Sequence, residues 1–279
     1  MSAVTTWPAP AKLNLFLHVT GRRGDGYHDL QTVFQLIDLA DDIRIQVRPD
    51  GLIERQTGPE GVPAEADLVV RAARALQAAS ASPLGATLSV TKRIPMGGGL
   101  GGGSSDAATV LVALNRLWNC GLNEDELAAI GVDLGSDVPV FVRGRSAWAE
   151  GRGERLVSLD LPDRDFVVLH PRVHVPTAAL FQAPELTRNS PPITIAGFLQ
   201  SGGRNDFEPV VRARYPEVAQ ALDWLGHFAP ARLTGTGSCI FAPCASRNEA
   251  QDIVTRVPAQ WRGMTARGMN VSPLLALRV

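Results

Sequence analysis

The sequence has little of what several classes of protein require. Its three cysteines, Cys120, Cys239 and Cys244, are an odd number and form no CxxC pair, so neither a disulfide framework nor a structural zinc site is expected. No apolar stretch approaches the roughly 20 residues that a membrane-spanning helix needs. The N-terminus has no basic start followed by an apolar run, which argues against a secretory signal. These absences predict a protein of the reducing cytoplasm.

The chain also has no excess of charge. Its 279 residues include 27 Lys and Arg against 28 Asp and Glu, and the net charge is −1. Proteins that bind nucleic acids by neutralising phosphates, or anionic membranes through a polybasic segment, need a basic surface. We therefore expect no nucleic-acid or membrane partner, and nothing in the sequence implies a protein partner. The length suffices for one large domain or two smaller ones.

Strands and helices are mixed in the first half of the sequence without the regular βαβ rhythm of a parallel sheet. Residues Ala11–Val19 alternate with a period of two, which predicts a strand with Lys12 and Asn14 on its polar side. Shorter strands are predicted around residues 43–47 and 87–92. This order favours the α+β class.

Three helices are predicted between these strands and the middle of the chain. Asp67–Ala79 carries an apolar stripe at helical spacing. A second helix follows Ser105 and should end with Gly121 at its C′ position. Asn123 is the expected N-cap of a third helix, which should end near Gly131.

One stretch of mixed composition divides the sequence. Residues 151–163 combine glycines, charges and Pro162 ahead of an apolar run, which marks a candidate domain boundary. We place the two domains at residues 1–162 and 163–279. The proline-containing stretch 183–192 is predicted to be a surface loop of the second half.

A glycine-rich loop is the strongest chemical signal. Six of the seven residues from 97 to 103 are glycine, and Ser104 and Ser105 lead into an amphipathic helix. Backbone N–H groups without side chains, beside the positive end of a helix dipole, form a site for phosphate. A flexible linker or a tight turn is the alternative, but a linker rarely lies between a strand and such a helix.

The loop does not match the common nucleotide-binding motifs. It lacks the lysine of a P-loop, and a GxGxxG match is almost automatic in so many glycines. No acidic residue follows at the offset of a dinucleotide fingerprint. The motifs of protein kinases, His-Arg-Asp and Asp-Phe-Gly, are also absent.

The loop and four further segments resemble the GHMP small-molecule kinases. The match to the family's ATP loop is PMGGGLGGGSSDAA at 95–108, and the other segments keep the family's order: PAPAKLN from residue 8, LGSDVPVF at 134–141, NDFEP at 205–209 and LTGTGSCIFA at 233–242. The resemblance implies a two-domain α+β fold, with an N-terminal domain like ribosomal protein S5 domain 2, a ferredoxin-like C-terminal domain and the active site between them.

The resemblance also implies the catalytic machinery. Lys12 and Asp137 would flank the acceptor hydroxyl, Asp137 aiming it and Lys12 stabilising charge; from the residues alone, a strand lysine and a turn aspartate are the alternatives. ATP would be the phosphoryl donor, with Mg²⁺ bridging its β- and γ-phosphates. Ser104 or Ser105 could reach the metal or a phosphate oxygen, or could cap the helix. The ATP-binding residues would be Pro95, Met96, Gly97, Gly98, Gly99, Leu100, Gly101, Gly102, Gly103, Ser104 and Ser105.

The opening segment, together with GYH at 26–28, resembles the branch whose acceptor is a cytidine-diphosphate-linked methylerythritol. In that branch the tyrosine and histidine grip cytosine, a task that suits an aromatic ring and an imidazole; a loop-packing tyrosine is the alternative. The acceptor-binding residues would be Asn14, Tyr27, His28, Thr177 and Phe181. A small-residue loop would close over the phosphates through Thr236, Gly237 and Ser238.

Other motifs receive no site role. Asn205-Asp206 is interpreted as a helix N-cap region. His170 and His174 are separated by prolines that break any helix aligning them, so no metal site is predicted there. Asp67 stands where the family often has asparagine, which leaves the adenine contacts open.

Three interpretations of function remain. The chain is a kinase of the cytidyl branch, another GHMP kinase of the homoserine or mevalonate type, or an ATP-binding sensor without catalysis. GYH at 26–28 and AKLNLFL at 11–17 belong to the cytidyl branch and disfavour the second interpretation. The presence of both Lys12 and Asp137 counts against the third.

Overall fold

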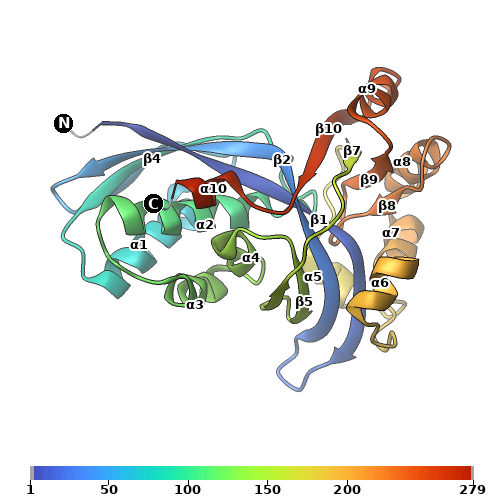
Figure 1. Cartoon of the computed structure of the whole chain (residues 1–279), viewed down its shortest axis with the longest axis horizontal. Coiled ribbons are helices and arrows are strands. Elements are labelled where there is room, and N and C mark those ends of the chain that lie inside the picture. The colour runs from blue at the N-terminus through green and yellow to red at the C-terminus, as the bar shows by residue number, and fades with distance from the viewer. Residues whose placement is uncertain (1–2, 278–279) are drawn as a thin grey trace.

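One mixed sheet extends through both halves of the molecule (Figure 1). The computed structural model describes residues 3–277. In that part of the chain the main strand order is β3–β4–β2–β10–β7–β9–β8, while β1 and β5 pair with β2, and β6 pairs with β5. The strands are β1 (Thr5–Arg22), β2 (His28–Arg48), β3 (Ile53–Thr57), β4 (Gly85–Thr91), β5 (Ala147–Gly151), β6 (Arg155–Ser158), β7 (Asp165–His170), β8 (Arg232–Leu233), β9 (Ile240–Cys244) and β10 (Arg262–Met269).

The two longest strands, β1 and β2, form an antiparallel hairpin that contributes to both halves. The predicted strand at 11–19 lies within β1, but its polar side is as buried as its apolar side. Lys12 and Asn14 are each only 3% exposed. The reason is that the glycine-rich loop and the segment ahead of α4 (Val138–Arg143) cover that side of the strand.

The helices of the first half pack on one face of the sheet (Figure 1). Two of the three predicted helix starts are confirmed: Asp67 caps α1, and Asn123 forms a capping box with Glu126 at the start of α3. The third is wrong, because α2 begins at Gly102 and not after Ser105. Besides α4, these helices are the 3₁₀ turn η1 (Ala64–Ala66), α1 (Leu68–Ser80), α2 (Gly102–Leu117) and α3 (Glu124–Leu134).

Two predicted helix ends are wrong. Helix α2 stops at Leu117 with Trp118 as its C-cap, so the C′ position is occupied by Asn119 (φ 55°), and Gly121 (φ 73°) lies two residues further on. Asparagine tolerates this conformation better than most residues. Helix α3 continues past Gly131 to Leu134. Gly131 is there for packing, since a Cβ at this position would lie 2.7 Å from the side chain of Val138.

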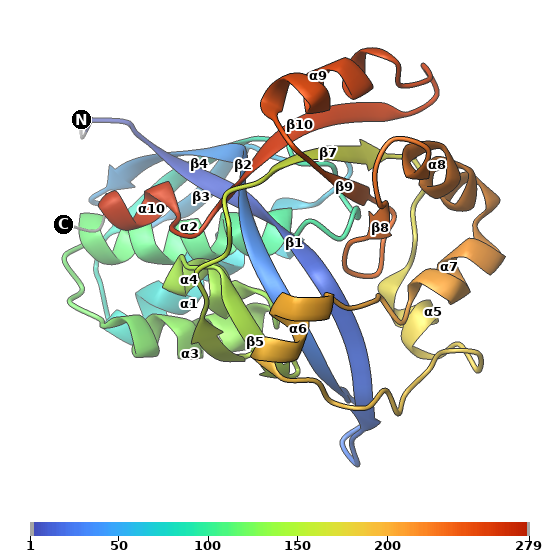
Figure 2. The ribbon, with the colours of Figure 1, turned by 45° about the vertical axis from the view of Figure 1, so that its right-hand side comes forward.

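The helices of the second half gather around β7, β8 and β9 (Figure 2). Helix α9 packs against β7 and β10, and α8 packs against β9. The predicted loop at 183–192 contains no helix or strand, but it is not only a surface loop, because Ala183, Leu186 and Ser190 are buried. These helices are α5 (Thr177–Phe181), α7 (Glu208–Arg214), α8 (Pro216–Gly226) and α9 (Arg247–Thr255). Helix α6 (Ile195–Ser201) instead packs Phe198 on Phe16 of β1, and α10 (Pro273–Ala276) lies with the first half.

Each half has its own apolar core, and elements from both ends of the chain cross between them. Leu17 and Val19 of β1 belong to the core of the second half. Leu274 of α10 packs into the core of the first half, near α2 (Figure 1). The boundary between residues 162 and 163 stays a prediction.

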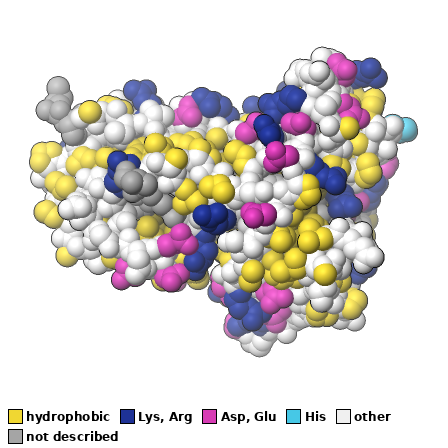
Figure 3. Space-filling model, in the orientation of Figure 1, with side chains coloured by type: hydrophobic (Ala, Val, Ile, Leu, Met, Phe, Trp, Pro, Cys, Tyr) yellow, Lys and Arg dark blue, Asp and Glu magenta, His cyan; other side chains and the backbone are white. Residues whose placement is uncertain are grey.

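The distribution of surface charge and the character of the helices agree with the expectations from composition. On the face shown in Figure 3, acidic and basic side chains are interspersed rather than collected by sign. Between residues 3 and 277, no helix combines the length and the apolar character needed to cross a bilayer.

Candidate active site

Most of the predicted site residues line one cleft between the two halves. The residues come from β1, the glycine-rich loop, the turn before α4, α5 and the loop after β8. The predicted residues that line it are Lys12, Asn14, Pro95–Ser104, Asp137, Thr177, Phe181 and Thr236. Tyr27 and His28 line an adjoining pocket with Phe181. Ser105, Gly237 and Ser238 lie outside both linings, and their roles stay predictions.

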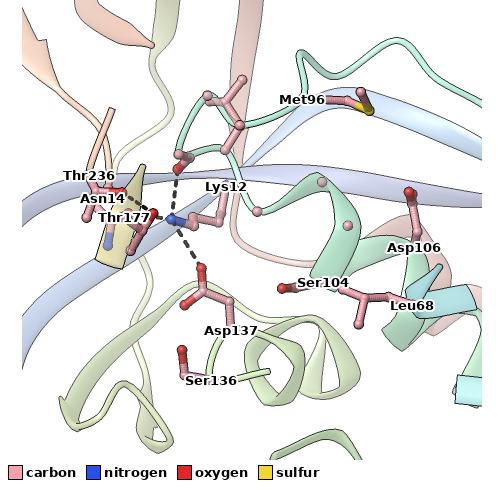
Figure 4. A pocket seen from close by; sticks show the side chains of 18 of the residues that line it. Lys12, Asn14, Leu68, Met96, Ser104, Asp106, Ser136, Asp137, Thr177 and Thr236 are labelled. Atoms are coloured by element: carbon pink, nitrogen blue, oxygen red, sulfur yellow. Dashed lines mark hydrogen bonds and ion pairs between the residues drawn. The ribbon is translucent and has the colours of Figure 1, made fainter. Parts of the chain in front are cut away.

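Lys12 is the centre of the cleft (Figure 4). Its ammonium donates to Asn14 Oδ1 and to the carbonyl of Gly99 at 2.9 Å, and it lies 3.4 Å from Asp137 Oδ2. An ammonium has three N–H donors, and these three acceptors come from β1, the glycine-rich loop and the turn before α4. The buried charge is therefore fully partnered, as burial requires.

Asp137 lies in a chain turn, as the sequence predicts. It occupies the N-cap position of α4, yet its side chain makes no capping hydrogen bond. The carboxylate points instead toward Lys12 and is 30% exposed (Figure 4). An ion-paired carboxylate that remains open to the cleft can accept a hydrogen bond from a ligand hydroxyl.

The glycine-rich loop packs backbone to backbone against the loop after β8. The N–H of Cys239 donates to the carbonyl of Gly98 at 3.1 Å. At Gly99 (φ 75°) a Cβ would lie 2.3 Å from the carbonyl oxygen of Thr234, so only glycine permits this approach. The two loops form one wall of the cleft.

The N-terminus of α2 opens onto the cleft. Gly101 is the N-cap, and neither serine caps the helix, so the capping alternative is not realised. Ser104 lines the cleft, and its hydroxyl lies on the side of Asp137 (Figure 4). Ser105 is fully buried, and its Oγ has no hydrogen-bond partner among residues 3–277. The first N–H groups of an α-helix have no partner within the helix, so those of α2 are available to an anion.

A buried ion cluster that the sequence analysis missed supports this helix. Lys92 bridges Asp41 and Asp106, with 2.8 Å to Asp106 Oδ2. Burial raises the pKa of Asp106 to about 7 against the opposing effect of Lys92, and Asp41 adds to the rise. Burial lowers the pKa of Lys92, but the two carboxylates outweigh it, so the net shift is upward. The sequence feature that could have indicated this cluster is the position of Lys92, directly after a strand and just before the glycine-rich loop.

The interpretation of Asn205-Asp206 as a helix N-cap region is incomplete. The N-cap of α7 is Phe207, whose N–H donates to Asn205 Oδ1 at 2.9 Å. Asn205 Nδ2 also donates to the carbonyls of Leu233 and Gly235 at 2.9 and 2.8 Å, and so fixes the loop after β8. The local spacing indicates the first contact but not the other two, whose partners lie about 30 residues away. Because Asn205 belongs to NDFEP, one of the five segments that resemble the family, that membership could have indicated a role at the site.

Asp206 joins β1 to the second half. Its Oδ2 accepts from the N–H of Val19 at 2.8 Å and from the hydroxyl of Ser190 at 2.6 Å. The carboxylate is 3% exposed, so these bonds replace the water that it loses. Asp206 therefore anchors the strand that carries Lys12.

The adjoining pocket is aromatic and basic. The ring of His28 stacks on Phe181 with the centroids 5.0 Å apart, and His28 Nε2 accepts from Arg188 Nε at 3.3 Å. Burial, with the charge of Arg188 and Arg22, lowers the pKa of His28. Tyr27 is 51% exposed, and its ring lies 3.7 Å from the guanidinium carbon of Arg152. This pocket offers flat apolar surfaces and a neutral imidazole.

Thr177 and Thr236 contact each other across the cleft, whereas the carboxylate of Asp67 is bound within its own half of the molecule. The hydroxyls of Thr177 and Thr236 are 2.8 Å apart, which links α5 to the loop after β8. Asp67 lines the cleft, but its carboxylate caps α1 and pairs with Arg55 at 2.5 Å. The contacts of an adenine there remain open.

Comparison with known proteins identifies a consistent set of relatives. Residues 67–145 match the GHMP kinases N terminal domain, and residues 185–263 match the GHMP kinases C terminal domain. The chain is similar to 4-diphosphocytidyl-2-C-methyl-D-erythritol kinase of Alkalilimnicola ehrlichii, with 55% identity over 275 residues that cover 99% of this chain and 94% of the relative. The protein of that name from Cupriavidus metallidurans is also 55% identical, over 96% of this chain and 94% of the relative.

Solved structures show the same similarity. A crystal structure of 4-(cytidine 5'-diphospho)-2C-methyl-D-erythritol kinase superimposes with a TM-score of 0.82 at 35% identity, over 95% of this chain and 99% of the other. The Methanococcus jannaschii mevalonate kinase gives a TM-score of 0.70 at 16% identity, over 97% and 99% of the two chains. At that identity the likeness concerns the fold alone.

Gly101→Val should abolish tight nucleotide binding. Gly101 has φ 73°, and a Cβ there would lie 2.9 Å from Phe141 and 3.1 Å from Lys12 Cε. The side chain would strain the loop and push Lys12 aside, so we expect affinity for a non-hydrolysable ATP analogue to fall by at least about tenfold. Titration calorimetry measures this affinity, and thermal unfolding checks that the variant is folded.

Gly226→Ala, at the end of α8 and outside the cleft lining, is the control and should leave the affinity unchanged. A Cβ at Gly226 would meet no atom within 4 Å, and a helix favours alanine over glycine. Unchanged affinity in a folded Gly101→Val protein would show that the phosphates bind elsewhere.

Proposed function

The chain belongs to the GHMP kinase family, and we propose that it transfers the γ-phosphoryl group of ATP to a hydroxyl of 4-diphosphocytidyl-2-C-methyl-D-erythritol. The products are the 2-phosphate and ADP, in the non-mevalonate route to isoprenoids. The observation that carries this proposal is 55% identity along nearly the whole chain to kinases named for that acceptor. The proposal includes a cytoplasmic site of action and a small molecule as the partner.

Asp137 and Lys12 are assigned to the transfer step. Phosphoryl transfer passes through a loose transition state, so catalysis consists mostly of positioning and charge stabilisation. Asp137 would accept a hydrogen bond from the attacking hydroxyl, orient it and take its proton late in the transfer. Lys12 would stabilise charge on the attacking oxygen and the γ-phosphate. Their separation of 3.4 Å and the open side of Asp137 support these roles.

The donor side is assigned to the glycine-rich loop and the start of α2. Free N–H groups and the helix dipole favour the phosphates of ATP. The hydroxyl of Ser104, which lines the cleft, is a hard oxygen ligand of the kind that Mg²⁺ prefers. Ser104 would hold the ion together with phosphate oxygens and water, and the ion would neutralise charge on the phosphates.

The acceptor side is assigned to the aromatic pocket. Tyr27 and Phe181 offer ring faces on which a base can stack, and the imidazole of His28 can hydrogen-bond the edge of the base. This pocket shares lining residues with the cleft of Lys12 and Asp137. A ligand with a base at one end and a hydroxyl at the other could therefore occupy both.

The alternatives are a kinase of the homoserine or mevalonate type and a non-catalytic sensor. The first is disfavoured because the solved mevalonate kinase is only 16% identical. The second is disfavoured because Lys12 and Asp137 lie together and face the cleft.

A panel of acceptors tests the proposed function. ADP release is measured with the cytidine-diphosphate-linked methylerythritol, homoserine, mevalonate and no acceptor. We expect turnover with the cytidyl compound well above the rate without acceptor. Preferential turnover of homoserine or mevalonate would replace the proposal by the first alternative, and no turnover of any acceptor would favour the sensor.

Asp137→Asn should lower kcat by about 10²-fold or more, because an amide cannot take the proton of the attacking hydroxyl. Affinity for ATP should change little. Steady-state kinetics measure kcat, and calorimetry measures nucleotide binding. Asp133→Asn, at an exposed position of α3, is the control and should behave as the wild type. Near-normal turnover in Asp137→Asn would remove this residue from the mechanism.

Tyr27→Ala should raise the KM of the acceptor by on the order of ten- to a hundredfold, because stacking on an aromatic ring is worth about 1–3 kcal/mol per base. Tyr27→Phe keeps the ring face and should have a much smaller effect. The KM of ATP should be unchanged in both. If Tyr27 only packs the loop, Tyr27→Ala would instead lower Tm and leave the acceptor KM unaltered.

A further inference from the structure

The proposed acceptor has a part that no residue described so far would bind. A diphosphate joins its cytidine to its methylerythritol, and this linker carries negative charge. If the base lies in the aromatic pocket and the reacting hydroxyl lies beside Lys12 and Asp137, the linker crosses the junction between the two. A buried anion needs a partner, so the junction should contain a cation.

Four residues line both the cleft and the aromatic pocket, and they define this junction. They are Leu30, Ser136, Arg152 and Phe181. Arg152 is the charged member of the set. Arg22 lines the aromatic pocket but not the cleft, and Lys12 lines the cleft but not the pocket.

Arg152 also keeps its hydrogen-bond donors available. Its guanidinium forms no ion pair and donates no hydrogen bond within residues 3–277; it lies on the ring of Tyr27 and is attracted at longer range by the carboxylate of Asp25. Two neighbouring cations are already engaged. Lys12 has its three partners, and Arg188 donates to His28 and to the carbonyls of Phe181, Ala183 and Leu186.

A short turn presents the side chain of Arg152. β5 ends at Gly151, and the N–H of Arg152 donates to Glu154 Oε2 at 2.6 Å. Gly151 and Gly153 on either side both have positive φ, 69° and 108°. The side chain is half-buried against Tyr27, so its position is fixed while its N–H groups remain available.

We propose that Arg152 binds the diphosphate of the acceptor. A guanidinium can stack with its face on an aromatic ring while its edge donates two parallel hydrogen bonds to phosphate oxygens. Arg152 would thus hold Tyr27 on one side and the linker at its edge. This inference rests on the proposed function, because it takes the cytidyl compound as the acceptor.

A comparison of cytidine with cytidine diphosphate isolates this contact. Binding of each is measured by calorimetry with the ATP site filled by a non-hydrolysable ATP analogue. We expect the wild type to bind the diphosphate more tightly. Arg152→Met keeps an apolar chain over Tyr27 and should remove about ten- to a hundredfold of that preference, the range for hydrogen bonds to charged groups. Its affinity for cytidine should stay within about twofold, the scatter expected when no contact to that ligand is lost.

Two further variants make the result specific. Arg152→Lys keeps the positive charge but loses the two parallel N–H donors of the guanidinium, so it should retain part of the preference for cytidine diphosphate over cytidine. Arg155→Met removes an exposed arginine three residues away, paired at 3.7 Å with Glu150, and should leave both affinities unchanged. If thermal unfolding shows that Arg152→Met does not fold, the preference for cytidine diphosphate is compared between Arg152→Lys and Arg155→Met instead.

Three outcomes would overturn the inference, and they are distinguishable. A full preference for the diphosphate in folded Arg152→Met, or in Arg152→Lys where that variant decides, would show that another group binds the linker. Equal losses for cytidine and its diphosphate would show that Arg152 only supports Tyr27. In both cases turnover of the cytidyl acceptor by the wild type would leave the proposed function intact. A wild type that binds neither ligand and does not turn over that acceptor would overturn both proposals together.

Discussion

The buried ammonium of Lys12 is the constraint on which the site depends. A lysine at 3% exposure is stable only if its charge and donors are satisfied. Asn14, Gly99 and Asp137 satisfy them, and these residues come from three separate parts of the chain. Folding the lysine into place therefore brings the glycine-rich loop and the aspartate together. The same requirement that stabilises the charge assembles the residues to which we assign phosphoryl transfer.

The β1–β2 hairpin connects Lys12 to both halves of the molecule. Lys12 lies on β1, the strand that also contributes Leu17 and Val19 to the core of the second half. Asp206 holds Val19, and Asn205 holds the loop that packs on Gly99. The cleft thus lies where the two halves share a strand, and a ligand within it contacts both.

The family resemblance predicts which side chains come together better than periodicity predicts the details of the fold. The pair Lys12 and Asp137 comes from that resemblance, because the residues alone fit a strand lysine and a turn aspartate equally, and the structure brings the two side chains within 3.4 Å. Periodicity alone placed Lys12 on the polar side of a strand, because periodicity carries no information about the segments that pack over that side and bury it. The role of Asn205 in holding the loop after β8 was missed for a related reason, since the partners of its Nδ2 are remote in sequence. Arg152 has no local signal, and only the junction of two cavities in the folded chain gives it a role.

A crystal structure of the ternary complex is the most direct test of the central claim. The complex would contain a non-hydrolysable ATP analogue and the cytidine-diphosphate-linked methylerythritol. The account predicts the accepting hydroxyl within about 3 Å of the Asp137 carboxylate, hydrogen-bond distance for a group that orients it, with the γ-phosphate beside Lys12 and the glycine-rich loop. A hydroxyl bound beyond the reach of Asp137, with the γ-phosphate directed away from Lys12, would contradict it.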